Sequence, residues 1–256
     1  MIDSHCHLAD SRFDSDFLDV LSRARDRGVD RFVAIADTFE EGDRCLKLAN
    51  KYDQIFCTMG VHPHRASTWN LSEGKAKIVE AAQHPKMVAV GEIGLDYHYM
   101  NSPKEDQIKA FRDQIEIAKE LELPLVVHNR DSIEDLMTVI NELQPPHMVL
   151  HCCTEEWGNV LELIDRGYLF GFTGIATYPK SQAIRDTIKH CPLKQMMVET
   201  DAPYLAPEGY RGKRCEPAYV VEVAALVAQI KGVSYEEVDR ITTANTEEFY
   251  GLSIAK

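Results

Sequence analysis

The segments IDSHCH (residues 2–7) and QMMVETD (residues 195–201), near the two ends of the chain, decide the fold that the sequence predicts. Each is a short β-type run followed by side chains that a divalent metal accepts as ligands: His5 and His7 in the first, Asp201 in the second. The first and last strands of an open sheet lie apart, whereas strand 8 of a closed (β/α)8 barrel neighbours strand 1. These two segments therefore favour the closed barrel.

The rest of the chain alternates short β-type runs with amphipathic helical patterns, which is typical of repeated βα units and a parallel sheet. We expect eight strands, at residues 2–6, 31–36, 55–61, 87–93, 124–128, 148–151, 168–173 and 195–199. A length of 256 residues suits one (β/α)8 TIM barrel of the α/β class. No Pro/Gly/Ser-rich linker or repeat interrupts the pattern, so we expect a single domain over residues 1–256.

Two helix starts carry clear signals. Ser102, Pro103 and Glu105 predict a capping box with proline at the first helical position, ahead of an apolar stripe made by Ile108, Phe111, Ile115 and Ala118. Ser234 and Glu237 predict a second capping box at the start of the last helix.

Three further ligand-type residues follow predicted strands inside the chain: Glu92, His128 and His151. His5 and His7 are spaced i, i+2, so that both rings lie on one side of an extended chain. A single histidine at a strand end is usually structural, but six candidates together (His5, His7, Glu92, His128, His151 and Asp201) suffice for two divalent metal ions if one carboxylate bridges them. The set predicts a metallohydrolase.

Composition narrows the class further. The 28 Lys and Arg against 41 Asp and Glu leave a formal charge of −13, which argues against a broad nucleic-acid-binding surface but not against a phosphate substrate. Arg211, Lys213 and Arg214 form a local basic patch or a solvated loop. Seven irregularly spaced cysteines predict reduced thiols without a metal role. With no apolar run of about 20 residues and no secretory signal, we expect a cytoplasmic protein that has no membrane partner and no obligatory protein partner.

Several segments resemble those of the TatD-type metal-dependent deoxyribonucleases of the amidohydrolase superfamily: DSHCHL (3–8), GVHPH (60–64), VGEIGLDY (90–97), LPLVVHNRD (123–131), LHC (150–152) and ETDAPYLAP (199–207). The resemblance implies a (β/α)8 hydrolase that cleaves DNA with divalent metal. It also implies one ion held by His5, His7, Glu92 and Asp201, and a second held by Glu92, His128 and His151. The chain departs from the family pattern at Cys153, Thr154 and Glu155, and at Cys215, and these changes bear on substrate preference more than on metal binding.

The leading hypothesis is hydrolysis of DNA phosphodiester bonds by a metal-activated water, with Asp201 and Glu92 as catalytic residues and two ions of Mg, Mn or Zn as cofactors. A barrel mouth admits a chain end more readily than an intact duplex, so single-stranded or frayed DNA ends are the expected substrate. The alternative is a metal-dependent hydrolase of a carbonyl ester or amide, such as a mischarged aminoacyl-tRNA or a lactone. A third possibility is a non-catalytic metal-stabilised barrel, although a structural site needs neither six ligands nor an open position.

Four residues are candidates for substrate contacts. His62 and Arg130 are expected to contact phosphate, and Tyr97 and Tyr204 to stack on a base. Each has an ordinary structural alternative: an ion pair of Arg130 with Asp131, a turn cap at His62, and packing for either tyrosine. Asn245, in the last predicted helix, is expected to be structural.

Overall fold

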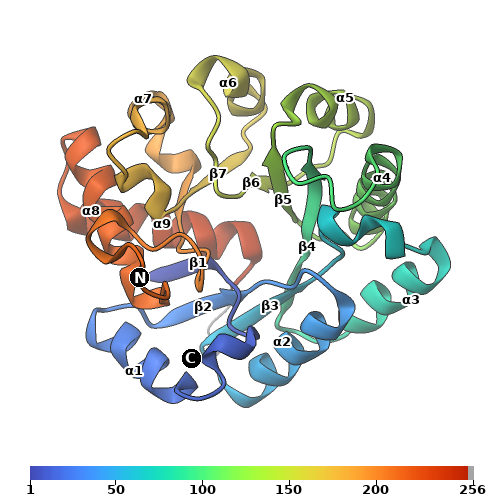
Figure 1. Cartoon of the computed structure of the whole chain (residues 1–256), viewed down its shortest axis with the longest axis horizontal. Helices are drawn as coiled ribbons and strands as arrows, with labels where there is room; N and C mark the ends of the chain where they lie inside the picture. Colours follow the sequence, from blue (N-terminus) through green and yellow to red (C-terminus); the bar gives the residue numbers. More distant parts are fainter. Residues whose placement is uncertain (253–256) are drawn as a thin grey trace. The chain divides into compact units, whose positions relative to one another are not determined.

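The computed structural model describes residues 1–252 (Figure 1). They divide into two compact units. Of the described residues, unit 1 comprises 1–33 and 152–252, and unit 2 comprises Ala34–His151. All eight expected strands are present, with bounds within a few residues of those expected, and helices follow them in alternation. The strand order is that of the sequence, β1 to β8, and β1 neighbours β8 within unit 1. This order is that of a (β/α)8 barrel, so the predicted fold class is confirmed.

Unit 2 contains four parallel strands with their helices. Its strands are β3 (Ile55–Met59), β4 (Met87–Asp96), β5 (Leu125–Arg130) and β6 (Met148–Leu150), and its helices are α2 (Phe39–Lys51), α3 (Leu71–Ala81), α4 (Lys104–Glu120), α5 (Ile133–Leu143) and the 3-10 helix η2 (Pro63–Thr68). β3 pairs with β4, β4 with β5 and β5 with β6, all parallel. Every residue of β3, β4 and β6 is buried, as expected for parallel strands covered on both faces.

The register of β4 on β5 depends on one glycine. Gly94 has φ +139° and pairs with His128, and a Cβ at this position would collide with the carbonyl oxygen of His128. Only glycine allows the two backbones to approach so closely. β4 extends to Asp96, beyond the expected end at residue 93, so that Glu92 lies inside the strand rather than at its end.

Unit 1 combines an N-terminal segment, residues 1–33, with a C-terminal segment, residues 152–252. It contains β1 (Ile2–Cys6), β7 (Leu169–Phe172) and β8 (Met196–Val198), with the helices α1 (Phe17–Asp26), α6 (Trp157–Asp165), α7 (Gln182–His190), α8 (Val220–Lys231) and α9 (Tyr235–Tyr250). Five 3-10 helices belong to its connections: η1 (Ser11–Phe13), η3 (Gly174–Thr177), η4 (Leu193–Gln195), η5 (Glu208–Tyr210) and η6 (Pro217–Tyr219). β2 (Arg31–Ala34) straddles the division between the units.

Side-chain hydrogen bonds tie the last helix to the strands of unit 1. The Tyr250 hydroxyl donates to the carbonyl of Ser4 in β1 (3.2 Å), and the Asn245 amide donates to the carbonyls of Leu193 (2.9 Å) and Met196 (2.7 Å). Asn245 therefore has the structural contacts that we expected. Among residues 1–252, no single helix is long and apolar enough to cross a membrane, although the bent pair Pro217–Lys231 and Tyr235–Tyr250 passes by length and composition.

One of the two predicted capping boxes is wrong. Ser234 caps α9 as expected, since its side chain accepts from the N–H of Glu237 (3.1 Å). α4 instead begins at Lys104 after Pro103, without a side-chain cap. The Ser102 hydroxyl is engaged with the η2 segment, donating to the His64 carbonyl (3.2 Å) and accepting from the Ser67 N–H (3.1 Å). The Ser102 hydroxyl therefore makes tertiary hydrogen bonds instead of the helix cap that the local pattern predicts.

Candidate metal centre

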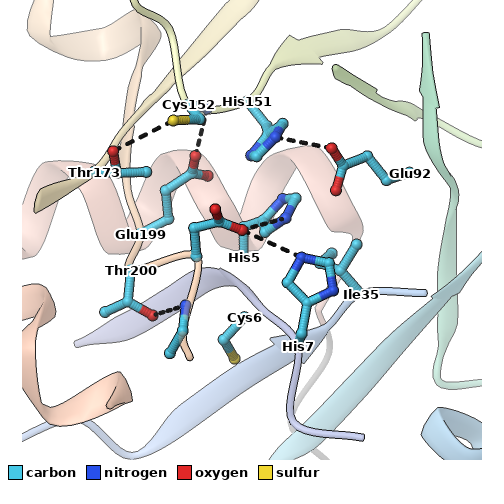
Figure 2. Close-up of polar contacts among 12 residues, drawn as sticks. His5, Cys6, His7, Ile35, Glu92, His151, Cys152, Thr173, Glu199 and Thr200 are labelled. Carbon is cyan, nitrogen blue, oxygen red and sulfur yellow. Dashed lines mark hydrogen bonds and ion pairs between the residues drawn. The ribbon is translucent and has the colours of Figure 1, made fainter. Parts of the chain in front are cut away.

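The first ligand cluster lies in unit 1, where β1 and the segment after β8 run side by side. The N–H of Asp201 donates to the His5 carbonyl (2.9 Å), and the N–H of His7 donates to the Ala202 carbonyl (2.7 Å). These bonds hold Oδ1 of Asp201 at 3.5 Å from Nε2 of His5 and at 3.2 Å from Nε2 of His7, as Figure 2 shows for the two rings. Both histidines are buried. Two imidazoles and a carboxylate thus converge on one point.

The second cluster lies in unit 2 and centres on one carboxylate oxygen. Oε1 of Glu92 is 2.9 Å from Nδ1 of His128, 2.9 Å from Nε2 of His151 and 3.4 Å from Nε2 of His62. Figure 2 shows the His151 ring turned toward Glu92. The Glu92 side chain is 3% exposed, so that its charge must be met inside the protein. Three imidazoles from β5 and from the segments after β3 and β6 do so.

Both clusters fit divalent metal ions. Ligand atoms about 2.0–2.2 Å from one ion lie about 3 Å from each other. The measured separations, 3.2–3.5 Å at Asp201 and 2.9–3.4 Å at Glu92, match that spacing. The mixed imidazole and carboxylate donor set suits Zn, Mn and related ions.

A second carboxylate, that of Asp96, contacts the ring nitrogen of His128 that does not face Glu92. Oδ2 of Asp96 lies 3.1 Å from Nε2 of His128 and 2.9 Å from Nε2 of His64. Burial raises the pKa of Asp96, but hydrogen bonds from His128, the Tyr99 N–H and His64 outweigh it, so the pKa is held well below its usual range. Burial lowers the pKa of His128, whereas Asp96 and Glu92 raise it, with a net increase above the ordinary value. The imidazole is thus oriented by carboxylates on both of its nitrogens.

Two buried acids stabilise the segment that carries Asp201. Asp3 accepts hydrogen bonds from the N–H (2.9 Å) and hydroxyl (2.6 Å) of Thr200, and burial raises the pKa of its carboxyl to about 8. Glu199 accepts from the N–H of Cys152 (2.6 Å) (Figure 2) and from the hydroxyl of Ser4 (3.3 Å). Sequence reasoning missed Asp3, Glu199, Asp96 and His64. Each is adjacent in sequence to a quoted ligand or lies in a quoted motif, but residue type alone did not reveal its partner.

The predicted substrate contacts lie in different settings. His62 belongs to the Glu92 cluster. The Arg130 side chain lies over the ring of Tyr99, with its guanidinium carbon 4.7 Å from the centroid, while Asp131 pairs with His98 instead (3.1 Å). The alternative ion pair of Arg130 with Asp131 is therefore wrong.

The two tyrosines differ in exposure. Tyr97 donates its hydroxyl to Asp135 (2.8 Å), and the Lys104 ammonium covers its ring (4.8 Å to the centroid). Tyr204 is 44% exposed, with Arg12 over its ring (4.3 Å) and the His7 ring 5.8 Å away. The stacking roles assigned to both tyrosines stay predictions, and the contacts of Tyr97 leave it the less accessible of the two.

The basic segment before Cys215 is largely structural. Arg214 pairs with Asp16 (2.7 Å) and Glu216 (2.9 Å), and Arg211 lies over the Tyr178 ring (4.5 Å). No disulfide joins the seven cysteines, all of which lie in residues 1–252. Glu155, one of the departures from the family pattern, accepts a hydrogen bond from Asn159 of α6 (2.9 Å).

A (β/α)8 strand order with histidine and carboxylate clusters in the strands and in the segments that follow them defines the class of metal-dependent hydrolase barrels. Comparison with known proteins identifies the family. The family model described as TatD related DNase matches residues 2–251, and the chain belongs to this family. It is a metal-dependent hydrolase, as the resemblance implied.

The similarity to known relatives extends over nearly the full length of both chains. An uncharacterised metal-dependent hydrolase, YabD of Bacillus subtilis, is 35% identical over 99% of this chain and 100% of its own. A protein of Citrobacter koseri named 3'-5' ssDNA/RNA exonuclease TatD is 34% identical, with 99% and 100% covered. The solved structure of the TatD homologue YjjV from Escherichia coli K12 superposes with a TM-score of 0.93 at 28% identity, covering 99% of this chain and 98% of the other.

Proposed function

We propose that this protein removes nucleotides from the ends of single-stranded or frayed DNA by hydrolysing phosphodiester bonds. The observation that carries the proposal is the convergence of three imidazoles on Oε1 of Glu92, together with the His5, His7 and Asp201 cluster. The name of the Citrobacter koseri relative supports a nucleic-acid substrate.

We propose two divalent ions of Mg, Mn or Zn. We propose that one ion is held by His5, His7, Asp201 and Glu92, and the other by Glu92, His128 and His151. We also propose that residues 1–256 form a single domain. When bound, such ions lower the pKa of water and stabilise charge on the attacking and leaving oxygens. Because Glu92 is buried, its electrostatic interactions are screened less than they would be in water. We also propose a cytoplasmic location, where the seven cysteines would stay reduced.

The protein's own groups have separate roles in this proposal. Asp201 orients the attacking water and accepts its proton, because its carboxylate is 14% exposed, whereas that of Glu92 is 3% exposed. Glu92 carries the negative charge that holds the imidazoles in place. Arg130 contacts a substrate phosphate, since it is exposed. His62 contacts substrate from the edge of the Glu92 cluster.

The test is cleavage of end-labelled single-stranded DNA by chelator-stripped protein with Mg, Mn or Zn restored. Asp201→Asn is assayed beside the wild type, and Asp53→Asn, at an exposed aspartate, is the matched control. A metal-dependent ladder that Asp201→Asn loses and Asp53→Asn keeps supports the proposal. Intact DNA under all three metals, with metal shown to be bound, contradicts it and makes an aminoacyl-tRNA ester the next substrate.

A further inference from the structure

An exposed aromatic platform lies beside the Glu92 cluster, in the loop that follows β4. Tyr99 is 54% exposed and the next residue, Met100, is 47% exposed. The Tyr99 and His64 rings form a T-shaped pair with 5.4 Å between centroids, and the His64 ring is 6.3 Å from that of His128. Tyr99 is therefore separated from a candidate metal ligand by a single side chain.

The platform carries a cation that no carboxylate neutralises. The guanidinium of Arg130, at the end of β5, lies over the Tyr99 ring. Within residues 1–252, Arg130 forms no ion pair with an acid, since its neighbour Asp131 is engaged with His98. In a chain with a formal charge of −13, such an exposed guanidinium is a local site for an anion.

The loop is anchored to the carboxylate that supports the metal ligand. Oδ1 of Asp96 accepts from the N–H of His98 (3.0 Å) and from the N–H of Tyr99 (2.9 Å), while Oδ2 faces His128 and His64. The Gln107 side chain in turn holds the Asp96 backbone, accepting from its N–H (2.8 Å) and donating to its carbonyl (3.0 Å). Tyr99 is thus held at a defined distance from the cluster rather than on a loosely attached loop.

We propose that Tyr99 and Arg130 form a nucleotide subsite, in which a base of the substrate stacks on Tyr99 and a phosphate pairs with Arg130. A tyrosine face with a guanidinium beside it offers the two groups that single-stranded nucleic acids require, a stacking surface and a cation. Tyr97, two residues earlier, is only half-buried and its hydroxyl donates to Asp135 (2.8 Å), whereas Tyr99 is exposed. The inference rests on the proposed function, because it names the part of a nucleic-acid substrate that this surface holds.

Binding of small probes tests the subsite without turnover. Isothermal titration of the full chain in Mg²⁺ compares deoxyadenosine 5'-monophosphate, which has a base, with 2-deoxyribose 5-phosphate, which has none. We expect Tyr99→Leu to weaken binding of the nucleotide by at least about fivefold, the lower end for loss of one base stack. Binding of the sugar phosphate should change less than twofold. Tyr99→Phe should retain nucleotide binding, whereas Arg130→Gln should weaken both probes.

The matched control is Tyr52→Leu, because Tyr52 also has a cation over its ring (Lys51, 5.1 Å) but lies in the segment before β3. The subsite is overturned if Tyr99→Leu weakens binding of both probes equally or of neither. It is also overturned if Tyr52→Leu weakens nucleotide binding as much as Tyr99→Leu does. On single-stranded DNA, we expect Tyr99→Leu to raise KM at least about fivefold and leave kcat within twofold.

The two proposals fail in different ways. Metal-dependent DNA cleavage with an unchanged KM in Tyr99→Leu overturns the subsite and leaves the nuclease. Tyr99-dependent nucleotide binding without any DNA cleavage overturns the nuclease and leaves the subsite.

Discussion

Oδ2 of Asp96 lies 3.1 Å from Nε2 of His128, while the other nitrogen of the same ring faces Glu92. An imidazole that a carboxylate holds at one nitrogen binds metal with the other, and loss of such a partner typically costs 10- to 100-fold in metal affinity. We therefore predict that Asp96→Asn lowers metal affinity about 10- to 100-fold, measured by titrating Mn²⁺ or Zn²⁺ into chelator-stripped protein.

The control for Asp96→Asn is Asp135→Asn, which removes a carboxylate from the same unit that pairs with Lys104 and Tyr97. It should leave metal affinity unchanged. Wild-type affinity in Asp96→Asn would show that Asp96 only stabilises the loop after β4.

Metal should stabilise the folded chain, because folding brings the imidazoles and carboxylate of each cluster together and the unfolded chain does not hold them so. A ligand at 100 times its Kd adds about 2.7 kcal/mol to the free energy of unfolding. We predict that Mn²⁺ or Zn²⁺ raises the Tm of stripped protein, and that His128→Ala reduces this rise. His147→Ala, at an exposed histidine, should keep the full rise in calorimetry. An equal rise in both variants would remove His128 from the ligand set.

Gly94 is predicted to be the least replaceable glycine near the Glu92 cluster. Its φ of +139° and the contact of an added Cβ with the His128 carbonyl oxygen strain any side chain. We expect Gly94→Ala to lower the free energy of unfolding by about 2–4 kcal/mol, measured by urea denaturation. Gly158→Ala, where an added Cβ meets open space in α6, should be neutral or stabilise by up to about 1 kcal/mol. Comparable losses in both variants would contradict the steric argument.

The Glu216 carboxylate should contribute stability that disappears in acid. Burial raises its pKa, but Arg23 (2.7 Å) and Arg214 (2.9 Å) outweigh burial and lower the pKa below its ordinary value. A lowered folded-state pKa stabilises the protein above the unfolded value, about 4.3, and this stability is lost as the pH falls through the folded value. We expect Glu216→Gln to cost about 1–2 kcal/mol at pH 7 and to approach the wild type near pH 3.

Urea denaturation at pH 7, 5 and 3 measures this difference. Glu208→Gln, at an exposed glutamate 3.6 Å from Arg211, is the control and should change stability little at any of these pH values. A constant gap between Glu216→Gln and the wild type across the pH range would mean that shape rather than charge accounts for the loss.

The side-chain contacts of residues close together in the chain could not be predicted from the sequence. Tyr97 and Tyr99 are the same residue type two positions apart, and nothing in the local pattern says that Tyr97 is engaged with Asp135 while Tyr99 is exposed. Ser102 satisfies the local rule for a helix cap, but it bonds to the His64 carbonyl, 38 positions away in the chain. Such hydrogen bonds depend on which loops the fold brings together.

The sequence by itself determined the order of strands and helices, the ligand-type residues at the strand ends and the family, because hydrophobic periodicity and short motifs are local properties of the chain. Tertiary structure alone decided that three imidazoles share one oxygen of Glu92, that Asp96 supports His128 and that Arg130 lies over Tyr99. These contacts join residues up to 59 positions apart, from Glu92 to His151. Only the packing of parallel strands, with a register set at Gly94, brings their side chains into contact.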